Sequence, residues 1–234
     1  MPNRQYHQGF LLDRLLYRDG LMLVINKPAG LPVHAGPGAG DNLENYFDAL
    51  RFGLPRPPAL AHRLDRDTSG CLVLGRHPKA LRKLGKLFSD GRIEKTYWAI
   101  CKGAPEKPSG RISAALKKQA RGKGWQVEIV PDEVEGAQAA ATTYRTLAQK
   151  GGLCFIEAKP KTGRTHQIRV HLASIGAPIL GDPQYGDLSA EDRSQPMMLH
   201  ARRIIIPISK NKEPVVVEAG PPEEMKSSLD TLGQ

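Results

Sequence analysis

The sequence predicts an α+β fold dominated by antiparallel β-sheet, with a few flanking helices. Three observations lead to this prediction. Short segments rich in β-branched and aromatic residues recur along the 234 residues, only three stretches show helical spacing of apolar residues, and no repeat of about 20 to 50 residues is visible. No linker divides the chain, and 40% of its residues are apolar, so we expect one domain over residues 1–234.

The N-terminal third is expected to form a buried strand followed by a loop and a short helix. Residues 21–25 are all apolar and predict the strand, which Pro28, Gly30 and Pro32 then end. Asp41 is expected to cap the helix, because apolar residues follow it at helical spacing. These residues are Leu43, Tyr46, Phe47 and Leu50.

Two further helices are predicted at residues 78–89 and 165–175, which end at Asp90-Gly91 and at Gly176 respectively. The first carries a basic face, which either is simply solvated or faces a nucleic acid. The basic residues are Lys79, Arg82, Lys83 and Lys86.

The remaining apolar segments predict strands. They span residues 95–100, 125–130, 141–148, 153–158, 199–206 and 215–218. The stretch 117–124 is basic and contains glycines, so we expect a flexible loop there. Such a loop could close over a phosphate backbone or form the tip of a hairpin.

Composition points to a polyanionic partner. Lys and Arg total 34 and Asp and Glu total 24, which gives a formal net charge of +10. Nucleic acid is the first candidate and an anionic membrane surface the second. We see no signal peptide and no apolar run near the ~20 residues that cross a bilayer. The three cysteines form no C-x-x-C pair, which favours buried thiols in a reduced cytoplasm over disulfides or a zinc site.

The stretch from His62 to Gly70 has the highest density of chemically active side chains. It reads H-R-L-D-R-D-T-S-G and holds two arginines, a histidine and two carboxylates in nine residues. Asp65 is flanked by Arg63 and Arg66, which should keep its carboxyl ionised at neutral pH. An ionised, positioned aspartate can act as a nucleophile or as a base.

Four motifs, in this order, resemble the RluA family of RNA pseudouridine synthases. They are N-K-P-x-G-[LIM]-x-V at 26–33, H-R-L-D-x-x-T-S-G at 62–70, K-x-Y at 95–97 and G-R-[TS]-H-Q-[IL]-R at 163–169. The resemblance extends from about residue 17 to residue 206. It implies the pseudouridine synthase fold and the isomerisation of uridine in RNA, in which the N1 glycosidic bond breaks, the base rotates and a C5 to C1′ bond forms. It implies no metal, redox cofactor or nucleotide.

The resemblance implies three catalytic residues. Asp65 matches the essential aspartate, which acts at the ribose as nucleophile or as proton acceptor. Arg164 matches the arginine that pairs with this aspartate, although a surface contact to phosphate is an alternative. Tyr97 matches the tyrosine beside the target base, whereas a lone strand tyrosine is ordinarily a core residue. Asp67 is expected to pair with Arg66 or to cap the turn.

The resemblance also implies contacts to the substrate. Arg63 is the candidate to stack in the space that a flipped nucleotide leaves, with a salt bridge to Asp67 as the alternative. His62 is expected to form a local hydrogen bond or to contact RNA. Lys95 is expected to support the site or to contact phosphate.

Two more positions complete the expected set of substrate contacts. Arg169 lies five residues after Arg164 and should face away from it, so it is either structural or RNA-binding. Leu199 falls where the family places an apolar residue against the target uracil, although Met198 could serve equally.

Many relatives carry an S4 RNA-binding domain ahead of the first motif, and only sixteen residues precede Tyr17 here. We therefore expect a cytoplasmic monomer that recognises a compact RNA, such as a tRNA stem-loop or an rRNA hairpin, through its own loops and basic surface.

Two rival functions stay open. The first is a glycosidase-like hydrolase that uses Asp65 and Asp67, although such enzymes need one carboxyl with a raised pKa and the flanking arginines would lower both pKa values. The second is an RNA-binding module that has the same fold but no catalytic activity.

Overall fold

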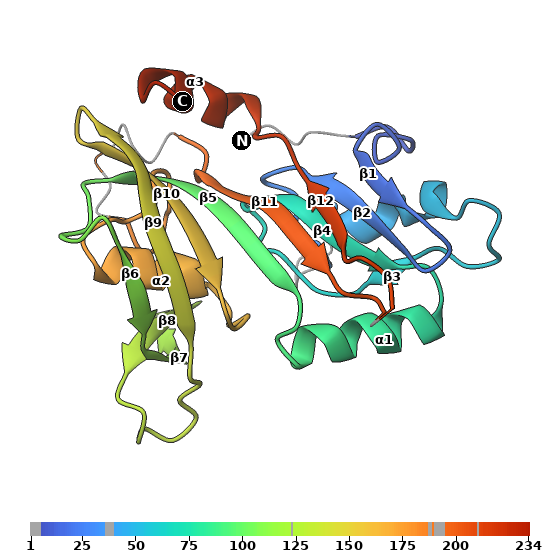
Figure 1. The fold of residues 1–234 in the computed structure, drawn as a ribbon, viewed down its shortest axis with the longest axis horizontal. Coiled ribbons are helices and arrows are strands. Elements are labelled where there is room, and N and C mark those ends of the chain that lie inside the picture. Colours follow the sequence, from blue (N-terminus) through green and yellow to red (C-terminus); the bar gives the residue numbers. More distant parts are fainter. Residues whose placement is uncertain (1–5, 36–39, 123, 187–188, 190–194, 210) are drawn as a thin grey trace. The chain divides into compact units, whose positions relative to one another are not determined.

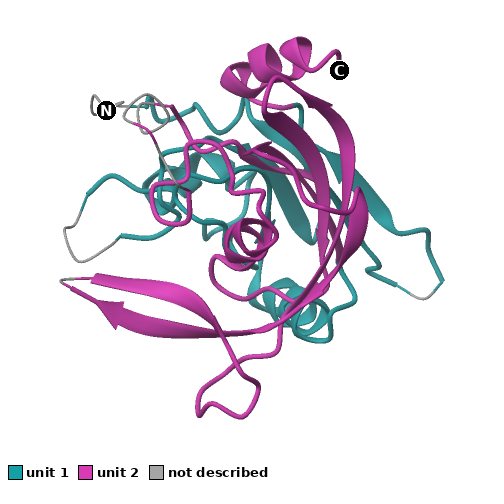
Figure 2. Cartoon of the chain, turned by 90° about the vertical axis from the view of Figure 1, so that its left-hand side faces the viewer, with its two compact units in different colours: residues 1–93, 203–220 teal, residues 94–202, 221–234 magenta. Residues whose placement is uncertain are grey.

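The structure is a computed structural model that describes residues 6–35, 40–122, 124–186, 189, 195–209 and 211–234. The chain groups into two compact units, one of residues 1–93 and 203–220 and the other of residues 94–202 and 221–234 (Figure 2). The single domain expected from the sequence stays a prediction.

The first unit is built on antiparallel strands and two helices (Figure 1). Strand β2 pairs with β1 on one side and β4 on the other, β3 also pairs with β4, and β11 pairs with β12. The strands are β1 (Leu15–Arg18), β2 (Met22–Lys27), β3 (Ala59–Leu60), β4 (Ser69–Gly75), β12 (Val215–Glu218) and residues 203–206 of β11 (Leu199–Ile206), and the helices are the 3₁₀ helix η1 (Leu43–Leu50) and α1 (Pro78–Ser89). All seven residues of β4 are buried, so this strand forms the centre of the core.

Helix α1 begins and ends where the sequence predicts. The Nδ1 of His77 caps its first turn by accepting a hydrogen bond from the Ala80 backbone N–H at 3.2 Å. Asp90 is the last capping residue, and Gly91 follows with φ +65°. At η1 the expected cap was wrong, because the side chain of Asn42, not Asp41, accepts from the helix backbone.

In the second unit four strands pair antiparallel in the order β5–β10–β9–β6, β7 and β8 form a separate hairpin, and two helices follow in the described chain. Its strands are β5 (Glu94–Lys102), β6 (Ser109–Ser113), β7 (Ala115–Arg121), β8 (Gly124–Val130), β9 (Ala141–Lys150) and β10 (Leu153–Pro160), and its helices are α2 (Gln167–Ser174) and α3 (Glu223–Thr231). The predicted α+β class with mainly antiparallel sheet is confirmed.

Two predictions in this unit were wrong in detail. The basic stretch 117–124 is strand up to Arg121, because β7 pairs with β8 in unbroken register from Ala115 opposite Val130 to Arg121 opposite Gly124. Residue 123 lies outside the described residues. Helix α2 starts at Gln167 and not at residue 165, because His166 has φ +52° and cannot continue a right-handed helix.

The cysteines are three buried free thiols, as the sequence predicts. None of the described helices reaches the length and apolar character required of a bilayer-spanning segment.

Gly181 is required for the turn that leads from β10 and α2 towards β11. It has φ +76°, and a Cβ there would lie 2.6 Å from the carbonyl carbon of Pro196 and 2.9 Å from the carbonyl oxygen of Gln195. Both neighbours are backbone atoms, which cannot move aside as a flexible side chain can.

We predict that Gly181→Ala lowers the free energy of unfolding by about 3 kcal/mol, from backbone strain and the collision together. Urea unfolding measures this change. Gly20→Ala is the matched control, because its Cβ would meet no atom within 4 Å, and it should change stability by less than about 0.5 kcal/mol. Equal stabilities of the two variants would show that the turn does not require glycine at position 181.

Candidate active site

Lys27 makes three side-chain hydrogen bonds, two of which link the first motif to the second. Its side chain is fully buried at the end of β2, and its Nζ donates to the carbonyl oxygens of Pro28 at 2.8 Å, Arg66 at 2.8 Å and Thr68 at 2.9 Å. The Arg66 carbonyl also accepts from the Gly30 N–H at 3.0 Å. The 26–33 segment therefore fixes the backbone that follows Asp65 through hydrogen bonds to Arg66 and Thr68.

The geometry around Lys27 suits a charged ammonium group. Burial lowers the pKa of Lys27 to about 7, while the nearby Asp67 and Asp65 carboxylates act to raise it. Three carbonyl oxygens accept from Nζ, and only the protonated amine has three N–H groups to donate. The site thus places a buried positive charge close to both carboxylates.

Asp65 lies on a turn that is anchored on both sides. Its carbonyl accepts from the Thr68 N–H at 3.2 Å, Leu64 before it is buried, and Thr68 and Ser69 after it are buried. The Asp65 residue itself is half-buried. A short turn with buried flanks holds the carboxylate with little freedom and leaves it accessible.

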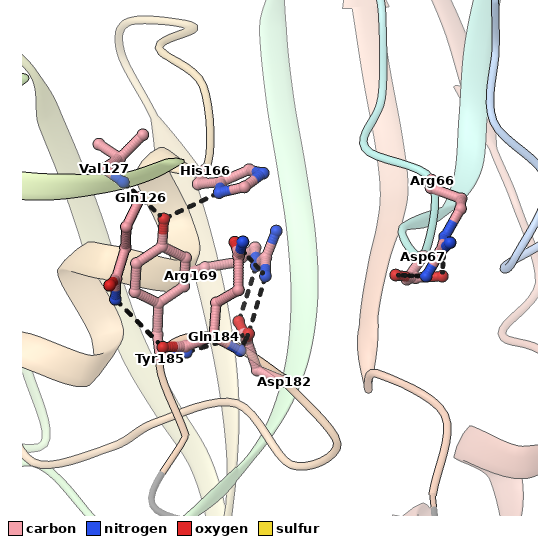
Figure 3. A network of polar contacts seen from close by, with 9 residues as sticks. All are labelled: Arg66, Asp67, Gln126, Val127, His166, Arg169, Asp182, Gln184 and Tyr185. Carbon is pink, nitrogen blue, oxygen red and sulfur yellow. Dashed lines mark hydrogen bonds and ion pairs between the residues drawn. The ribbon is translucent and has the colours of Figure 1, made fainter. Parts of the chain in front are cut away.

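Asp67 is occupied by a surface ion pair. Arg66 donates from Nε to Oδ1 at 3.1 Å and from Nη2 to Oδ2 at 3.3 Å (Figure 3). The expected partner Arg66 is therefore the observed one, and the alternative salt bridge between Arg63 and Asp67 does not form. Arg63 is exposed and makes no hydrogen bond or ion pair with any described residue.

His62 has a local structural contact. Its Nε2 accepts from the Val73 backbone N–H at 3.0 Å, and its ring stacks on Phe88 of α1 with centroids 4.4 Å apart. These contacts connect the start of the Asp65 motif to β4 and to α1.

In the second unit, Lys95 and Tyr97 lie two residues apart on β5 and so point to the same face of the sheet. Tyr97 is buried, with 8% of its surface exposed. The Nζ of Lys95 donates to the Thr162 carbonyl at 3.2 Å, and burial lowers the pKa of Lys95. Lys95 therefore supports the loop that carries Arg164.

Gln167 organises that loop from a buried position. Its Nε2 donates to the Ala141 carbonyl and to the Thr142 hydroxyl, both at 3.0 Å. Its Oε1 accepts from the Thr162 hydroxyl at 2.6 Å and from the Arg164 N–H at 3.1 Å. The four hydrogen bonds use the full capacity of the amide.

Arg164 is exposed on this loop, and its Nε donates to the Ala139 carbonyl at 3.2 Å. Its other guanidinium nitrogens make no hydrogen bond to a described residue. The pairing of Arg164 with Asp65 stays a prediction.

Arg169 is committed to a buried ion pair. Its Nε lies 2.7 Å from Oδ2 of Asp182, and its Nη2 lies 2.8 Å from Oδ1, a bidentate geometry (Figure 3). The Asp182 side chain is fully buried and also accepts from the backbone N–H groups of Gln184 and Tyr185. Of the two alternatives for Arg169, this arrangement favours the structural one.

The hairpin β7–β8 is attached to the start of α2 through aromatic side chains. The Tyr185 hydroxyl accepts from the Val127 N–H at 3.0 Å and lies 2.8 Å from Nδ1 of His166 (Figure 3). The His166 ring stacks on Trp125, and Lys118 lies 3.9 Å above the Trp125 ring on its own strand pair. His166 thus has a structural contact.

Leu199 begins β11 with 3% of its surface exposed, and Met198 beside it is equally buried. The Met198 backbone bonds to Leu180 and Ile100. The two side chains therefore stay equivalent candidates for an apolar contact with the substrate.

The structure assembles the predicted residues into two local groups. Asp65, Arg63 and His62 lie in the 62–70 segment of the first unit, and in the second unit Lys95 contacts the loop that carries Arg164. No group of three or more His, Cys, Asp or Glu side chains that could hold a metal ion occurs in the described part of the chain.

Comparison with known proteins gives a consistent result. A family model described as RNA pseudouridylate synthase matches residues 21–174. A Zymomonas mobilis protein named as an RNA pseudouridine synthase is 45% identical over 215 residues, which cover 91% of this chain and 95% of that protein. The ribosomal large subunit pseudouridine synthase D of Borreliella burgdorferi is 33% identical over 84% of this chain and 62% of its own length. The solved structure of human RNA Pseudouridylate Synthase Domain Containing 4 has a TM-score of 0.81 and 29% identity, and covers 97% of this chain and 95% of that one.

We predict that Lys27→Met lowers the free energy of unfolding by about 3 kcal/mol or more, because three carbonyl oxygens lose their donor. Urea unfolding measures this loss. Lys79→Met removes the same charge from the exposed face of α1 and should change stability by less than about 0.5 kcal/mol. A Lys27→Met protein as stable as the control would show that the three hydrogen bonds do not hold the turn.

Proposed function

The chain belongs to the RNA pseudouridylate synthase family, and on this premise we propose that Asp65 is the residue that reacts at the ribose of the target uridine. The enzyme is an isomerase that acts on RNA. In this reaction the bond between N1 of uracil and C1′ of ribose breaks, and a bond between C5 and C1′ replaces it.

The observation that carries the assignment is the contrast between the two carboxylates of the 62–70 segment. Asp67 is neutralised by the bidentate contact with Arg66, whereas Asp65 lies on the anchored turn above the buried Lys27 ammonium. A carboxylate fixed on such a turn can serve as a nucleophile or as a base. Both mechanisms are compatible with this position.

Arg164 and Tyr97 are proposed to complete the catalytic set. The Arg164 loop is fixed by Gln167 and Lys95, so its guanidinium is presented to solvent from a rigid backbone. A guanidinium held in this way suits an ion pair with a carboxylate in a site from which water is excluded. Tyr97 offers a ring to stack on uracil and a hydroxyl for proton transfer.

Arg63 is proposed to help extract the target nucleotide from its stack. Extrusion of a base costs a few kcal/mol, and a guanidinium can offset part of this cost by stacking in the vacated space. Support comes from its exposure next to a backbone that Lys27 and His62 hold in place.

The substrate is proposed to be a hairpin of large-subunit rRNA or a tRNA stem-loop, modified by a cytoplasmic monomer. Relatives named as ribosomal large subunit synthases support the rRNA alternative. The net charge of +10 supports binding of a polyanion through many phosphate contacts.

We predict that Asp65→Asn lowers the single-turnover rate of pseudouridine formation by about 10³-fold or more, since the amide cannot serve as nucleophile or base. The assay follows tritium released from C5 of uridine in unmodified transcripts of tRNA and of large-subunit rRNA. The dissociation constant for RNA should stay within about threefold of the wild-type value.

Asp67→Asn is the matched control, because it removes the neighbouring carboxylate and should retain activity within about tenfold. An Asp65→Asn protein with near wild-type activity would refute the assignment. A wild-type protein that binds these RNAs and modifies none of them would favour the non-catalytic RNA-binding module.

A further inference from the structure

A groove in the first unit gathers positive charge away from the Asp65 turn. Its volume is about 320 Å³, and its lining comes from the second half of α1 and the segments that follow α1 and β11. Helix α1 and strand β11 are labelled in Figure 1. It is lined by Arg82, Lys83, Lys86, Leu87, Asp90, Arg92, Pro207, Ile208 and Ser209. Four of these side chains are cationic and one is anionic.

The charges of the groove are largely uncompensated. Lys86 pairs with Asp90 at 3.2 Å, with the Lys86 side chain 76% exposed. Arg82, Lys83 and Arg92 are exposed and make no hydrogen bond or ion pair through their side chains with any described residue. The groove therefore has a net positive charge with guanidinium and ammonium groups available to a ligand.

Helix stability does not account for these residues. Lys86 lies in the last turn of α1, where a positive charge is favourable to the helix dipole, and Arg92 follows the end of the helix. Arg82 and Lys83 lie one turn earlier, and each has a basic residue four positions away, Lys86 and Lys79 respectively. Like charges at that spacing destabilise a helix. A polyanion in the groove would remove this repulsion.

The floor of the groove is apolar, formed by Leu87, Pro207 and Ile208. A basic rim above an apolar floor suits a nucleotide, whose phosphate pairs with the rim while its sugar and base cover the floor. An isolated inorganic anion would use the rim alone.

The groove lies on the side of α1 away from the Asp65 motif. Phe88, which stacks on His62, and the pair Lys86 and Asp90 project from opposite sides of the helix at about 100° per residue. A phosphate bound in the groove therefore belongs to a nucleotide other than the one at Asp65.

We propose that this groove binds the phosphodiester backbone of the substrate RNA in a segment that flanks the target uridine. The inference rests on the proposed function, because it assigns a second contact surface for the same RNA. It adds affinity and leaves the chemical step unchanged.

The test compares two triple variants that remove the same charge. Arg82→Gln/Lys83→Gln/Arg92→Gln removes the three groove cations that have no ion pair with a described residue, and Lys107→Gln/Lys150→Gln/Lys226→Gln removes three exposed lysines elsewhere. The probe is a fluorescein-labelled transcript from the activity assay. Fluorescence anisotropy gives its dissociation constant between about 50 and 200 mM KCl, where phosphate contacts have a measurable salt dependence.

For the groove variant we expect a dissociation constant raised about tenfold or more, and a log–log salt slope reduced by about 2 to 3, which is 0.7 to 0.9 for each lost contact. Its single-turnover rate at saturating RNA should stay within about twofold of wild type. The control variant should keep the wild-type slope.

Equal dissociation constants and slopes for the two variants would overturn the proposal, because net charge alone would then explain binding. A lost rate with unchanged binding would also overturn it. If the wild-type protein modifies no transcript, the proposed function fails, while the comparison of binding slopes still decides whether RNA occupies the groove.

A second measurement does not depend on weakened binding. Lys83→Cys places an exposed thiol on the rim, and the three native cysteines are buried, so a photoreactive reagent labels this position selectively. We expect crosslinking to the transcript that excess unlabelled RNA suppresses. No crosslink to RNA, or a crosslink only to an acidic protein added as competitor, would overturn the proposal.

Discussion

The Lys27 ammonium group is the interaction on which the Asp65 turn depends. A turn has few backbone hydrogen bonds of its own, and buried carbonyl groups need donors. Lys27 supplies three donors from a strand that runs beside β4, with Lys27 opposite Gly70 in the register. Burying a charge costs several kcal/mol unless it is well paired. The three hydrogen bonds of the Lys27 ammonium group offset this cost. One side chain thereby fixes the backbone that directly follows the proposed catalytic aspartate.

In the second unit, too, buried polar side chains form hydrogen bonds that fix a loop backbone. Gln167 replaces missing backbone partners in the loop of Arg164, and Lys95 holds the same loop from β5. The buried pair of Arg169 and Asp182 then fixes the segment that follows α2. At both Asp65 and Arg164, a buried and hydrogen-bonded side chain, Lys27 or Gln167, fixes the backbone that carries the proposed catalytic residue.

The sequence predicted most elements because their signals are local. Helix α1 could be bounded to the residue, since Pro78 starts it, leucines follow at helical spacing and Gly91 ends it. The sequence predicts a loop in place of the second half of strand β7, because the exposed residues of this strand are basic. Its pairing with β8 depends on the tertiary structure, which the local sequence does not show. The short strands β1, β3 and β6 and the polar helix α3 had too weak a pattern to be recognised. Lys27 and Gln167 lie in two of the four motifs, but the sequence predicts no role for them. Their roles depend on burial, which the local sequence does not show. The same holds for the partner of Arg169, thirteen residues away.

The most direct test of the central claim, that Asp65 on this turn makes pseudouridine in RNA, is chemical mapping of pseudouridine in total RNA from the source cell. Four strains are compared: wild type, a deletion of this gene, and the deletion complemented with the wild-type gene or with Asp65→Ala. We expect at least one tRNA or large-subunit rRNA site to disappear in the deletion and to return only with the wild-type gene. No change at any site, or restoration by Asp65→Ala, would contradict the account.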